Sequence, residues 1–270
     1  MRTRTTVLTL LATLVLAVAA TTAHAQAREE GRLLLASQVL QEMRGGRDQA
    51  IPDRLLERAY AIAVIPDTTK IAWFFGGRRG HGVLVVRDKD GRFSGPIFIT
   101  MTGGSFGFQW GVQSTDVVLV FTTPRGVQGI NGGKVTLGGD LSVAAGPVGR
   151  DALAATDATF KAEVYSYSRS RGAFIGLALD GSVISIDDGA DGDFYRKPGV
   201  LSGDIISGSV RSNDESARRF LAAVSTSTDG QRQASAAPPP APAAPAPAPA
   251  APAAAQSFPL SDPKPGSEPK

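Results

Sequence analysis

The stretch "GGDLSVAAGPVGRD", residues 138–151, combines several glycines with one strong cation. Successive glycine N–H groups can form a concave nest that binds an anion, and the guanidinium of Arg150 can contact a phosphate through two hydrogen bonds. Gly149 and Arg150 are therefore candidate residues for binding a phosphate group. The alternative is a tight turn in which Arg150 pairs with Asp151 or Asp157.

Other cations lie near this stretch in the sequence and could complete an anion-binding site. They are Lys134, Lys161, Arg169 and Arg171. On a strand, Arg169 and Arg171 would share one face of the sheet. The turn that contains Arg78 and Arg79 is a rival basic patch.

Catalytic side chains are scarce in this chain. It has no cysteine, which excludes thiol catalysis and thiolate metal sites, and of its two histidines His24 lies in an N-terminal leader. A serine hydrolase would therefore depend on His81, which stands between two glycines where a strand is expected to start. The G-x-S-x-G motif is absent. We predict that the protein is not an enzyme.

Two further stretches resemble ligand-binding loops but lack the required residues. In "GINGGKVT", residues 129–136, the glycine that should open a phosphate loop is replaced by the preceding Gln128, and Val135 follows the lysine. "DDGADGD", residues 187–193, lacks the spacing and the closing glutamate of a calcium loop. We interpret the first as a turn into a strand and the second as a solvated acidic turn that starts a helix. No metal or cofactor is predicted.

The first 25 residues have the features of a secretory signal peptide. Arg2 and Arg4 form a positively charged start, an apolar run covers residues 7–20, and Ala23-His24-Ala25 matches a cleavage site. The alternative is an uncleaved anchor, for which the apolar run is short. Cleavage would place the protein in the periplasm or outside the cell.

Charge and composition divide the remaining chain into a domain over residues 26–230 and a tail over residues 231–270. The whole chain has a net charge of +3; the leader accounts for two of these charges and the tail for one, so the domain is formally neutral. A neutral domain offers no general attraction to nucleic acid. The Ala/Pro-rich tail is expected to be a disordered arm, either featureless or able to reach an envelope protein.

Within the domain, the pattern predicts helices at both ends and strands between them. Helices are expected over residues 28–44, 51–66, 191–197 and 212–224. Between them, short β-type runs alternate with glycine-rich turns, including hairpins at Asp90-Gly91 and Asp180-Gly181. Because regular βα alternation is missing, we predict an α+β fold: a twisted antiparallel sheet or partial barrel with the N-terminal helices packed over it.

The helix expected over residues 28–44 has two alternative roles. Its apolar residues, with Arg28, Arg32 and Arg44 beside them, could contact a membrane, although three glutamates dilute the positive charge. The membrane-contact residues would be Leu33, Leu34, Val39, Leu40 and Met43. Alternatively, the apolar face docks on the protein's own sheet.

Several segments together resemble the SYLF domain family, also called the Ysc84-type domain, over about residues 31–207. Ser94 and Pro96 match the family's serine-x-proline step, and "GGSFGFQWG", residues 103–111, matches its glycine-rich motif. The Gly-Pro-x-Gly-Arg motif is matched by residues 146–150, and a Tyr-Ser and Ser-x-Gly run by residues 163–181. The residue before Ser94 is phenylalanine, where many relatives carry tryptophan.

The resemblance implies a protein that binds phospholipid, with phosphoinositides and actin as ligands of eukaryotic members. An exported, bacterial member would meet another anionic phospholipid and no actin. We therefore expect non-catalytic binding of anionic phospholipid at a membrane surface in the cell envelope. The alternative is a structural or protein-interaction module of the envelope.

Overall fold

The computed structural model describes the middle of the chain. The described ranges are 25–44, 51–72, 76–105, 111–147, 161–170, 173–174 and 179–228. Residues 1–24, the expected tail, and the candidate site residues Gly149, Arg150 and Arg171 lie outside these ranges. The boundaries expected for the leader and the tail therefore stay predictions.

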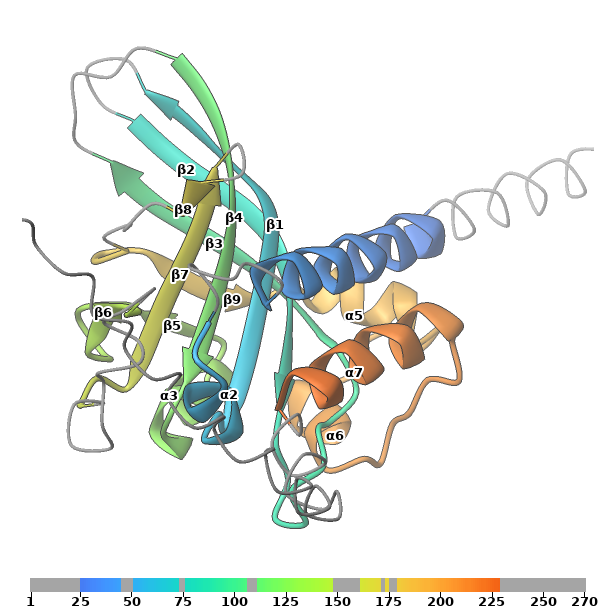
Figure 1. Cartoon of the computed structure of the whole chain (residues 1–270). Helices are drawn as coiled ribbons and strands as arrows, with labels where there is room; N and C mark the ends of the chain where they lie inside the picture. The colour runs from blue at the N-terminus through green and yellow to red at the C-terminus, as the bar shows by residue number, and fades with distance from the viewer. Residues whose placement is uncertain are drawn as a thin grey trace, which may run out of the picture.

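One twisted sheet forms the centre of the protein (Figure 1). Its strands are β1 (Ala61–Ala72), β2 (Gly76–Val86), β3 (Ile97–Ser105), β4 (Gly111–Phe121), β5 (Lys134–Thr136), β6 (Val143–Ala145), β7 (Val164–Ser170), β8 (Ala173–Phe174) and β9 (Val183–Ile186). They lie in the order β5-β9-β3-β2-β1-β4-β7-β6, with β8 paired to β7. Neighbouring strands are antiparallel, except that β6 and β7 are parallel. The predicted twisted sheet or partial barrel is confirmed, as a mixed and curled half-barrel.

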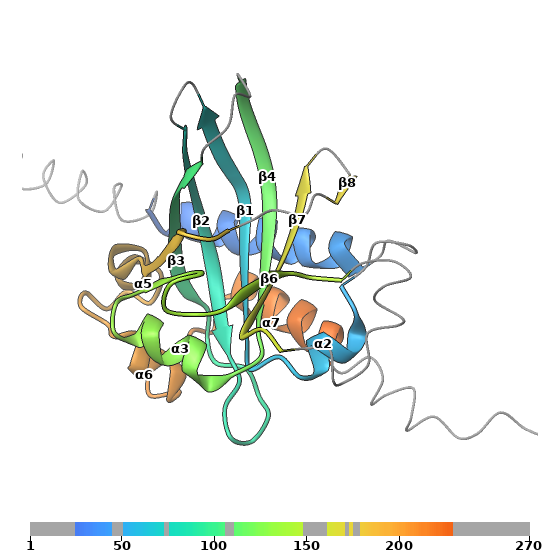
Figure 2. The same cartoon turned by 90° about the vertical axis from the view of Figure 1, so that its left-hand side faces the viewer.

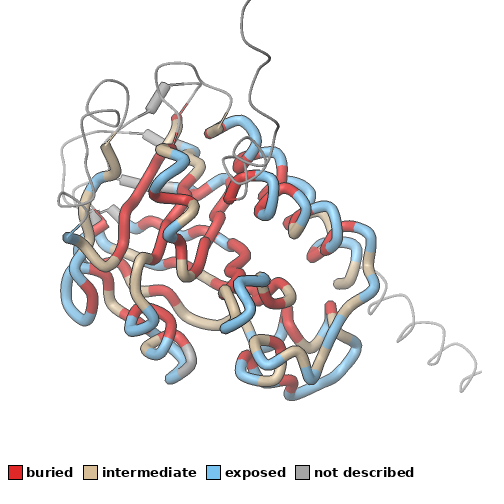
Figure 3. The backbone as a smooth tube through the Cα atoms, turned by 60° about the horizontal axis from the view of Figure 1, so that its bottom comes forward, coloured by how far each residue is buried: buried red, intermediate tan, exposed pale blue. Residues whose placement is uncertain are grey.

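Both faces of the sheet are buried, because successive side chains of a strand point to opposite faces. In β1, Ile62 and Val64 belong to one hydrophobic core, whereas Ala61, Ala63 and Ile65 belong to the other. Figure 3 shows the central strands as buried along much of their length. The sheet therefore needs a covering layer on each side.

Helices provide these two covering layers. On the first face lie the N-terminal helix over residues 25–44, α2 (Asp53–Glu57), α5 (Asp188–Phe194) and α7 (Glu215–Thr228). On the second face lie α3 (Pro124–Asn131) and α6 (Ser202–Ile206). Figures 1 and 2 show the N-terminal helix and α7 side by side against the sheet. The prediction of an α+β fold with N-terminal helices packed over the sheet is confirmed.

The prediction of a helix over residues 51–66 is wrong for the second half of this range. Only Asp53–Glu57 is helical, and the apolar run that follows opens β1. A strand that is buried on both faces has a continuous apolar run, and the periodicity of such a run does not distinguish it from a buried helix. Here residues 61–64 pair with β2 and residues 61–65 pair with β4, which fixes them as a central strand.

The predicted turns and late helices are found, with shifted helix ends. Gly91 and Gly181 have φ angles of 80° and 76°, which glycine adopts without strain. The helices expected over residues 191–197 and 212–224 are α5 and α7. Within residues 129–136, the last residues of α3 are followed by a turn at residues 132–133 that leads into β5, so the expected turn into a strand is found. Within the described ranges, no helix has the length and apolar character needed to cross a membrane.

Candidate functional site

The described part of the Gly-Pro-x-Gly-Arg motif holds a tyrosine of the protein's own sheet. Gly146 lies against the ring of Tyr167, and a side-chain carbon at this glycine would be 2.0 Å from a ring atom. The Tyr167 hydroxyl also donates to the carbonyl of Pro147 at 3.4 Å. The first half of the motif therefore packs β6 against β7. Gly149 and Arg150, the residues expected to bind phosphate, lie outside the described residues.

The serine-x-proline motif has a similar structural role. The Ser94 hydroxyl accepts a hydrogen bond from the Val86 N–H at 3.1 Å and donates to the Gly95 carbonyl at 2.8 Å. The Tyr195 hydroxyl donates to the Pro96 carbonyl at 2.8 Å and leaves no room for a side chain on Gly95. This motif therefore ties the start of β3 to the residue after α5.

The cations expected to complete an anion site do not form one cluster. Lys134 is exposed in β5, whereas Arg169 is in β7, and five strands separate the two in the sheet. Arg169 instead forms an ion pair of 2.6 Å with Glu42 of the N-terminal helix. Lys161 is exposed ahead of β7, and Arg171 lies outside the described residues. These cations are near one another in the sequence, but the order of the strands in the sheet decides how far apart they lie.

The rival basic pair is divided between the two faces of the sheet. Arg78 and Arg79 are adjacent on β2, so their side chains point in opposite directions. Arg78 is buried, and burial lowers its pKa below the usual value. Arg79 is exposed. These two arginines therefore do not act together on one anion.

His81 lacks the geometry of a general base in a catalytic triad. Its Nδ1 atom lies 3.2 Å from the Thr100 hydroxyl and 3.7 Å from an oxygen of Asp187. In a triad the nucleophile and the acid contact opposite nitrogens of the ring, whereas here both groups approach the same nitrogen. Burial lowers the pKa of His81, and the positive charges of Arg32 and Arg79 lower it further. Among the described side chains, no cluster of histidine and carboxylate groups could hold a metal ion.

The acidic stretch 187–193 provides the N-cap and most of α5, rather than the predicted solvated turn ahead of a helix, and one of its acids is buried. Asp187 caps the helix by accepting a hydrogen bond from the Ala190 N–H at 3.2 Å. Asp191 is fully buried and accepts from the Phe98 N–H at 2.9 Å. Burial raises the pKa of Asp191 to about 8, and the nearby carboxylates contribute to the rise. The hydrogen bond between Asp191 and Phe98 connects α5 to β3 and places the carboxyl group of Asp191 inside the core.

The N-terminal helix is docked on the sheet, so the membrane-contact prediction is corrected for four of its five residues. The buried four are Leu33, Val39, Leu40 and Met43. They belong to the core that covers the first face of the sheet, which needs an apolar layer. Leu34 and Leu35 lie on the outer side of the helix and are 44% and 46% exposed.

Ion pairs hold the docked helix near both of its ends. Near its start, the buried Glu29 lies 3.1 Å from Arg32, which lies 3.7 Å from Asp187 at the start of α5. Near its end, Glu42 pairs with Arg169 of β7. These pairs connect the helix to two separate elements and fix its position on the sheet.

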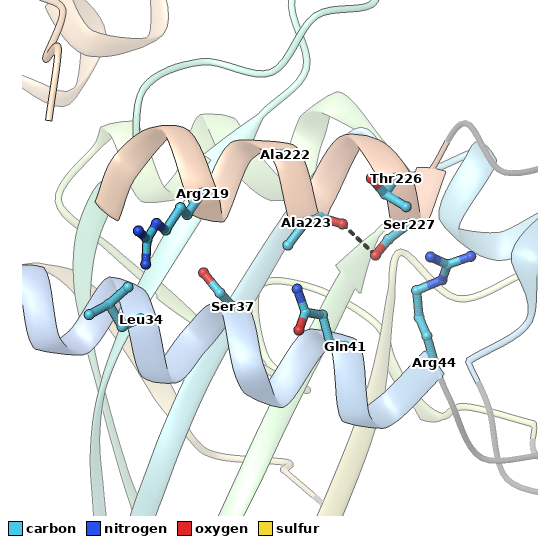
Figure 4. Close-up of a pocket in the computed structure, with 9 residues that line it drawn as sticks. All are labelled: Leu34, Ser37, Gln41, Arg44, Arg219, Ala222, Ala223, Thr226 and Ser227. Carbon is cyan, nitrogen blue, oxygen red and sulfur yellow. Dashed lines mark hydrogen bonds between the residues drawn. The ribbon is translucent and has the colours of Figure 1, made fainter. Parts of the chain in front are cut away.

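A groove with a volume of about 370 Å³ runs between the N-terminal helix and α7 (Figure 4). Its lining residues are Leu34, Ser37, Gln41 and Arg44 from the N-terminal helix, and Arg219, Ala222, Ala223, Thr226 and Ser227 from α7. In Figure 4, Leu34 and Arg219 lie at one end of this helical groove, and Arg44 and Ser227 lie at the other. The two helices therefore run in the same direction, and the small side chains of α7 leave space between them.

The helical groove has positive charge at both ends. None of the described residues that line it carries a carboxylate. Arg219 forms an ion pair with Glu215 one turn earlier in α7. Arg44 lies 3.9 Å from Asp53, and its buried Nε–H has no hydrogen-bond partner among the described residues. Arg44 therefore has one donor that no described residue satisfies.

Only one of the two walls of this groove could be recognised in the sequence. Leu34, Ser37, Gln41 and Arg44 recur at helical spacing, which marks one stripe of the N-terminal helix. The second wall comes from α7, far away in the chain, and only the fold brings the two stripes together.

Comparison with known proteins gives relatives for the folded region. Residues 102–227 match the Ysc84 family model, described as Las17-binding protein actin regulator. The chain is 41% identical over 165 residues to LAS seventeen-binding protein 3 of Saccharomyces cerevisiae, which covers 60% of this chain and 36% of that protein. It is 34% identical over 166 residues to SH3 domain-containing YSC84-like protein 1 of Homo sapiens, which covers 60% of this chain and 48% of that protein.

Protein YSC84 of Saccharomyces cerevisiae is a third relative, 40% identical over 169 residues, which cover 62% of this chain and 36% of that protein. The chain thus spans between about a third and a half of the length of these curated relatives. The family description refers to Las17 binding and actin regulation, and the name of LAS seventeen-binding protein 3 refers to binding; none of these names refers to catalysis. The family match and these identities agree with the motifs of the sequence: the chain carries a domain of the Ysc84, or SYLF, family.

Proposed function

We propose that this domain is a non-catalytic module that binds anionic phospholipid at a membrane surface. The observation that carries the proposal is the outer face of the first helical layer, which we define by Leu34, Leu35, Arg28, Arg44 and Arg219. Two adjacent leucines remain about half exposed there, although the rest of the apolar face is buried. Exposed leucines flanked by arginines are typical of helices that lie in a lipid interface.

The expected strength of this contact follows from its composition. Burying the exposed half of each leucine contributes about 1 kcal/mol, and each arginine near an anionic surface contributes about 1 kcal/mol. Arg28 and Arg219 have acidic neighbours, Glu29 and Glu215, which reduce their share. The sum is about 3 to 5 kcal/mol, which corresponds to half-saturation at roughly millimolar lipid or somewhat below. The binding is therefore weak, reversible and sensitive to salt.

The setting is proposed together with the ligand. The leader over residues 1–25 supports export, and an exported domain would meet the anionic phospholipids of an envelope membrane. The tail over residues 231–270 would act as an arm that reaches an envelope protein. Peripheral contact through the outer face requires no spanning segment.

A second candidate function is protein binding as a structural or interaction module. Its support is the family description, Las17-binding protein actin regulator, and the name of the yeast relative at 41% identity. The N-terminal helix lies outside the matched residues 102–227. The support for this candidate therefore does not depend on the exposed leucines.

The two candidates are separated by vesicle flotation of the chain purified after export, with removal of the leader checked by mass. Vesicles that contain phosphatidylglycerol are compared with vesicles of phosphatidylcholine alone, at low and high salt. We expect flotation with the anionic vesicles that declines as salt rises. Flotation with neither vesicle type overturns the phospholipid proposal and leaves protein binding as the function.

A matched pair of variants tests whether the outer face makes the contact. Leu34→Asp with Leu35→Asp removes the exposed leucines and adds repulsion, so flotation should be lost. Leu201→Asp changes another leucine, 65% exposed at the start of α6, and should leave flotation unchanged. Equal loss in both variants would contradict a role specific to the outer face.

A further inference from the structure

We infer that the helical groove is the subsite for the phosphodiester headgroup of the lipid, with Arg44 and Gln41 as its donors. This inference rests on the proposed function and adds the place and the chemistry of recognition. It concerns one end of the groove, where the N-terminal helix ends beside Ser227 of α7 (Figure 4).

The charge of the groove selects an anion. The nine described lining residues include two arginines and none with a carboxylate. Two acids outside the lining, Asp53 and Glu215, contact the arginines of the groove. A negative group inside the groove therefore meets arginine without a competing carboxylate on the same surface.

The hydrogen bonds of the groove indicate which donors are available. The hydroxyls of Ser37 and Ser227 donate to carbonyls of their own helices, at 2.8 Å and 2.6 Å. Arg219 is held by Glu215. Arg44 has a buried Nε–H without a partner among the described residues. Turning the partly exposed guanidinium toward the groove would present this Nε–H and a neighbouring N–H together, which suits two oxygens of one phosphate.

Gln41 lies one turn before Arg44 on the same stripe of the helix, and its side-chain amide is exposed. An amide N–H₂ would add a neutral donor beside the guanidinium. The two residues come from a docked helix whose buried face is fixed by the core, so their positions are set before a ligand arrives.

The length and polarity of the groove favour a lipid headgroup over free phosphate. Leu34 and Arg44 are ten residues apart, about 15 Å along the helix. At the Leu34 end, Leu34 and the adjoining exposed Leu35 lie beside Arg219, whose charge is paired with Glu215, whereas the Arg44 end carries the N–H without a partner among the described residues. A phospholipid matches this order, because its phosphodiester can contact Arg44 while its glycerol and first chain carbons lie over Leu34 and Ala222.

The test measures binding of the exported chain to phosphatidylglycerol vesicles in two matched charge variants. Arg44→Gln removes the proposed donor, and we expect affinity to fall about tenfold, as for a lost hydrogen bond to a charged group. Arg218→Gln removes the same charge from an exposed residue of α7 that does not line the groove, and should change affinity less than about twofold. Equal effects of the two variants would overturn the inference.

A second variant is expected to bind more tightly, a result that loss of the fold could not produce. Asp53→Asn removes the acid that lies 3.9 Å from Arg44 and leaves the arginine in place. Because Asp53 competes with a bound anion for the guanidinium, we expect affinity to rise roughly two- to fivefold, the size of an exposed ion pair. Unchanged or weaker binding in Asp53→Asn counts against Arg44 as the donor.

A soluble probe separates failure of this inference from failure of the proposed function. Short-chain phosphatidylglycerol below its micelle concentration is titrated against the chain, with glycerol 3-phosphate as a probe that lacks acyl chains. Saturable binding of the short-chain lipid that is lost in Arg44→Gln supports the groove, even if vesicles are not bound. Binding of vesicles that is intact in Arg44→Gln overturns the groove but not the membrane function. Equal affinity for glycerol 3-phosphate would overturn the choice of a lipid.

Discussion

Replacing Asp191 with asparagine should remove a pH dependence from the stability of the fold. Asp191 is the fully buried acid of α5, and it accepts the Phe98 N–H at 2.9 Å. Its second oxygen has no hydrogen-bond partner among the described residues. Burial raises its pKa from 3.8 to about 8; the charges of Asp188, Asp187 and Glu29 add to this rise, and the Phe98 hydrogen bond opposes it.

The sign of the effect follows from proton binding. Between about pH 4 and pH 8 the folded state keeps the Asp191 proton, whereas the unfolded state releases it. The stabilisation from this group is therefore complete below the unfolded pKa and is lost as pH rises through the folded pKa. A gap of about 4 units, at about 1.4 kcal/mol per unit, amounts to a loss on the order of 5 kcal/mol.

The assay is urea unfolding of the wild type and of Asp191→Asn from about pH 5 to about pH 8. Asparagine keeps an oxygen for the Phe98 N–H but places an N–H₂ without a partner in the core, which costs about 1 to 3 kcal/mol at every pH. The informative quantity is thus the slope of unfolding free energy against pH, which should be steeper in the wild type. Asp188→Asn, at an exposed neighbour, should keep most of the wild-type slope. Parallel lines for the wild type and Asp191→Asn would refute the reasoning.

Two further substitutions test the packing on which the site depends. Gly146→Ala puts a carbon 2.0 Å from the Tyr167 ring and should cost at least about 2 kcal/mol of unfolding free energy, whereas Gly104→Ala meets no atom within 4 Å and should cost little, as measured by denaturant unfolding. Leu40→Ala should cost about 2 to 5 kcal/mol because Leu40 is fully buried in the docked helix, and Leu35→Ala should cost under about 1 kcal/mol; equal melting temperatures of these two variants would show that the helix is not docked.

The local features of the fold could be predicted from the sequence. Turns at Gly91 and Gly181 and the docked apolar face of the first helix depend on a few adjacent residues, and the sequence pattern contains them. The run after α2 could not be assigned in this way, because residues 61–65 are apolar on both faces and only their pairing with β2 and β4 makes them a strand.

The candidate site was harder to predict, because it depends on contacts between distant segments. Arg169 was expected beside Lys134, but it pairs with Glu42, 127 residues away in the chain. Arg44 was recognised only as one cation flanking a helix, and its role depends on the groove that α7 completes. Residue type and spacing identify which groups can bind an anion, whereas the fold decides which of them face the same space.

The motifs that identify the family and the residues proposed to bind lipid belong to different parts of the molecule. The described motif residues fix tyrosines: Gly146 and Pro147 hold Tyr167, and the segment 94–96 holds Tyr195. The family match over residues 102–227 includes α7 but not the N-terminal helix, which provides the other wall of the groove. The contacts of Tyr167 and Tyr195 involve neither Leu34 nor Arg44, so two proteins with this domain could share these contacts and still differ in the helix that contacts the ligand. Ligand preference should follow the stripe that carries Leu34 and Arg44, and exchanging this stripe between relatives should transfer it without disturbing the fold.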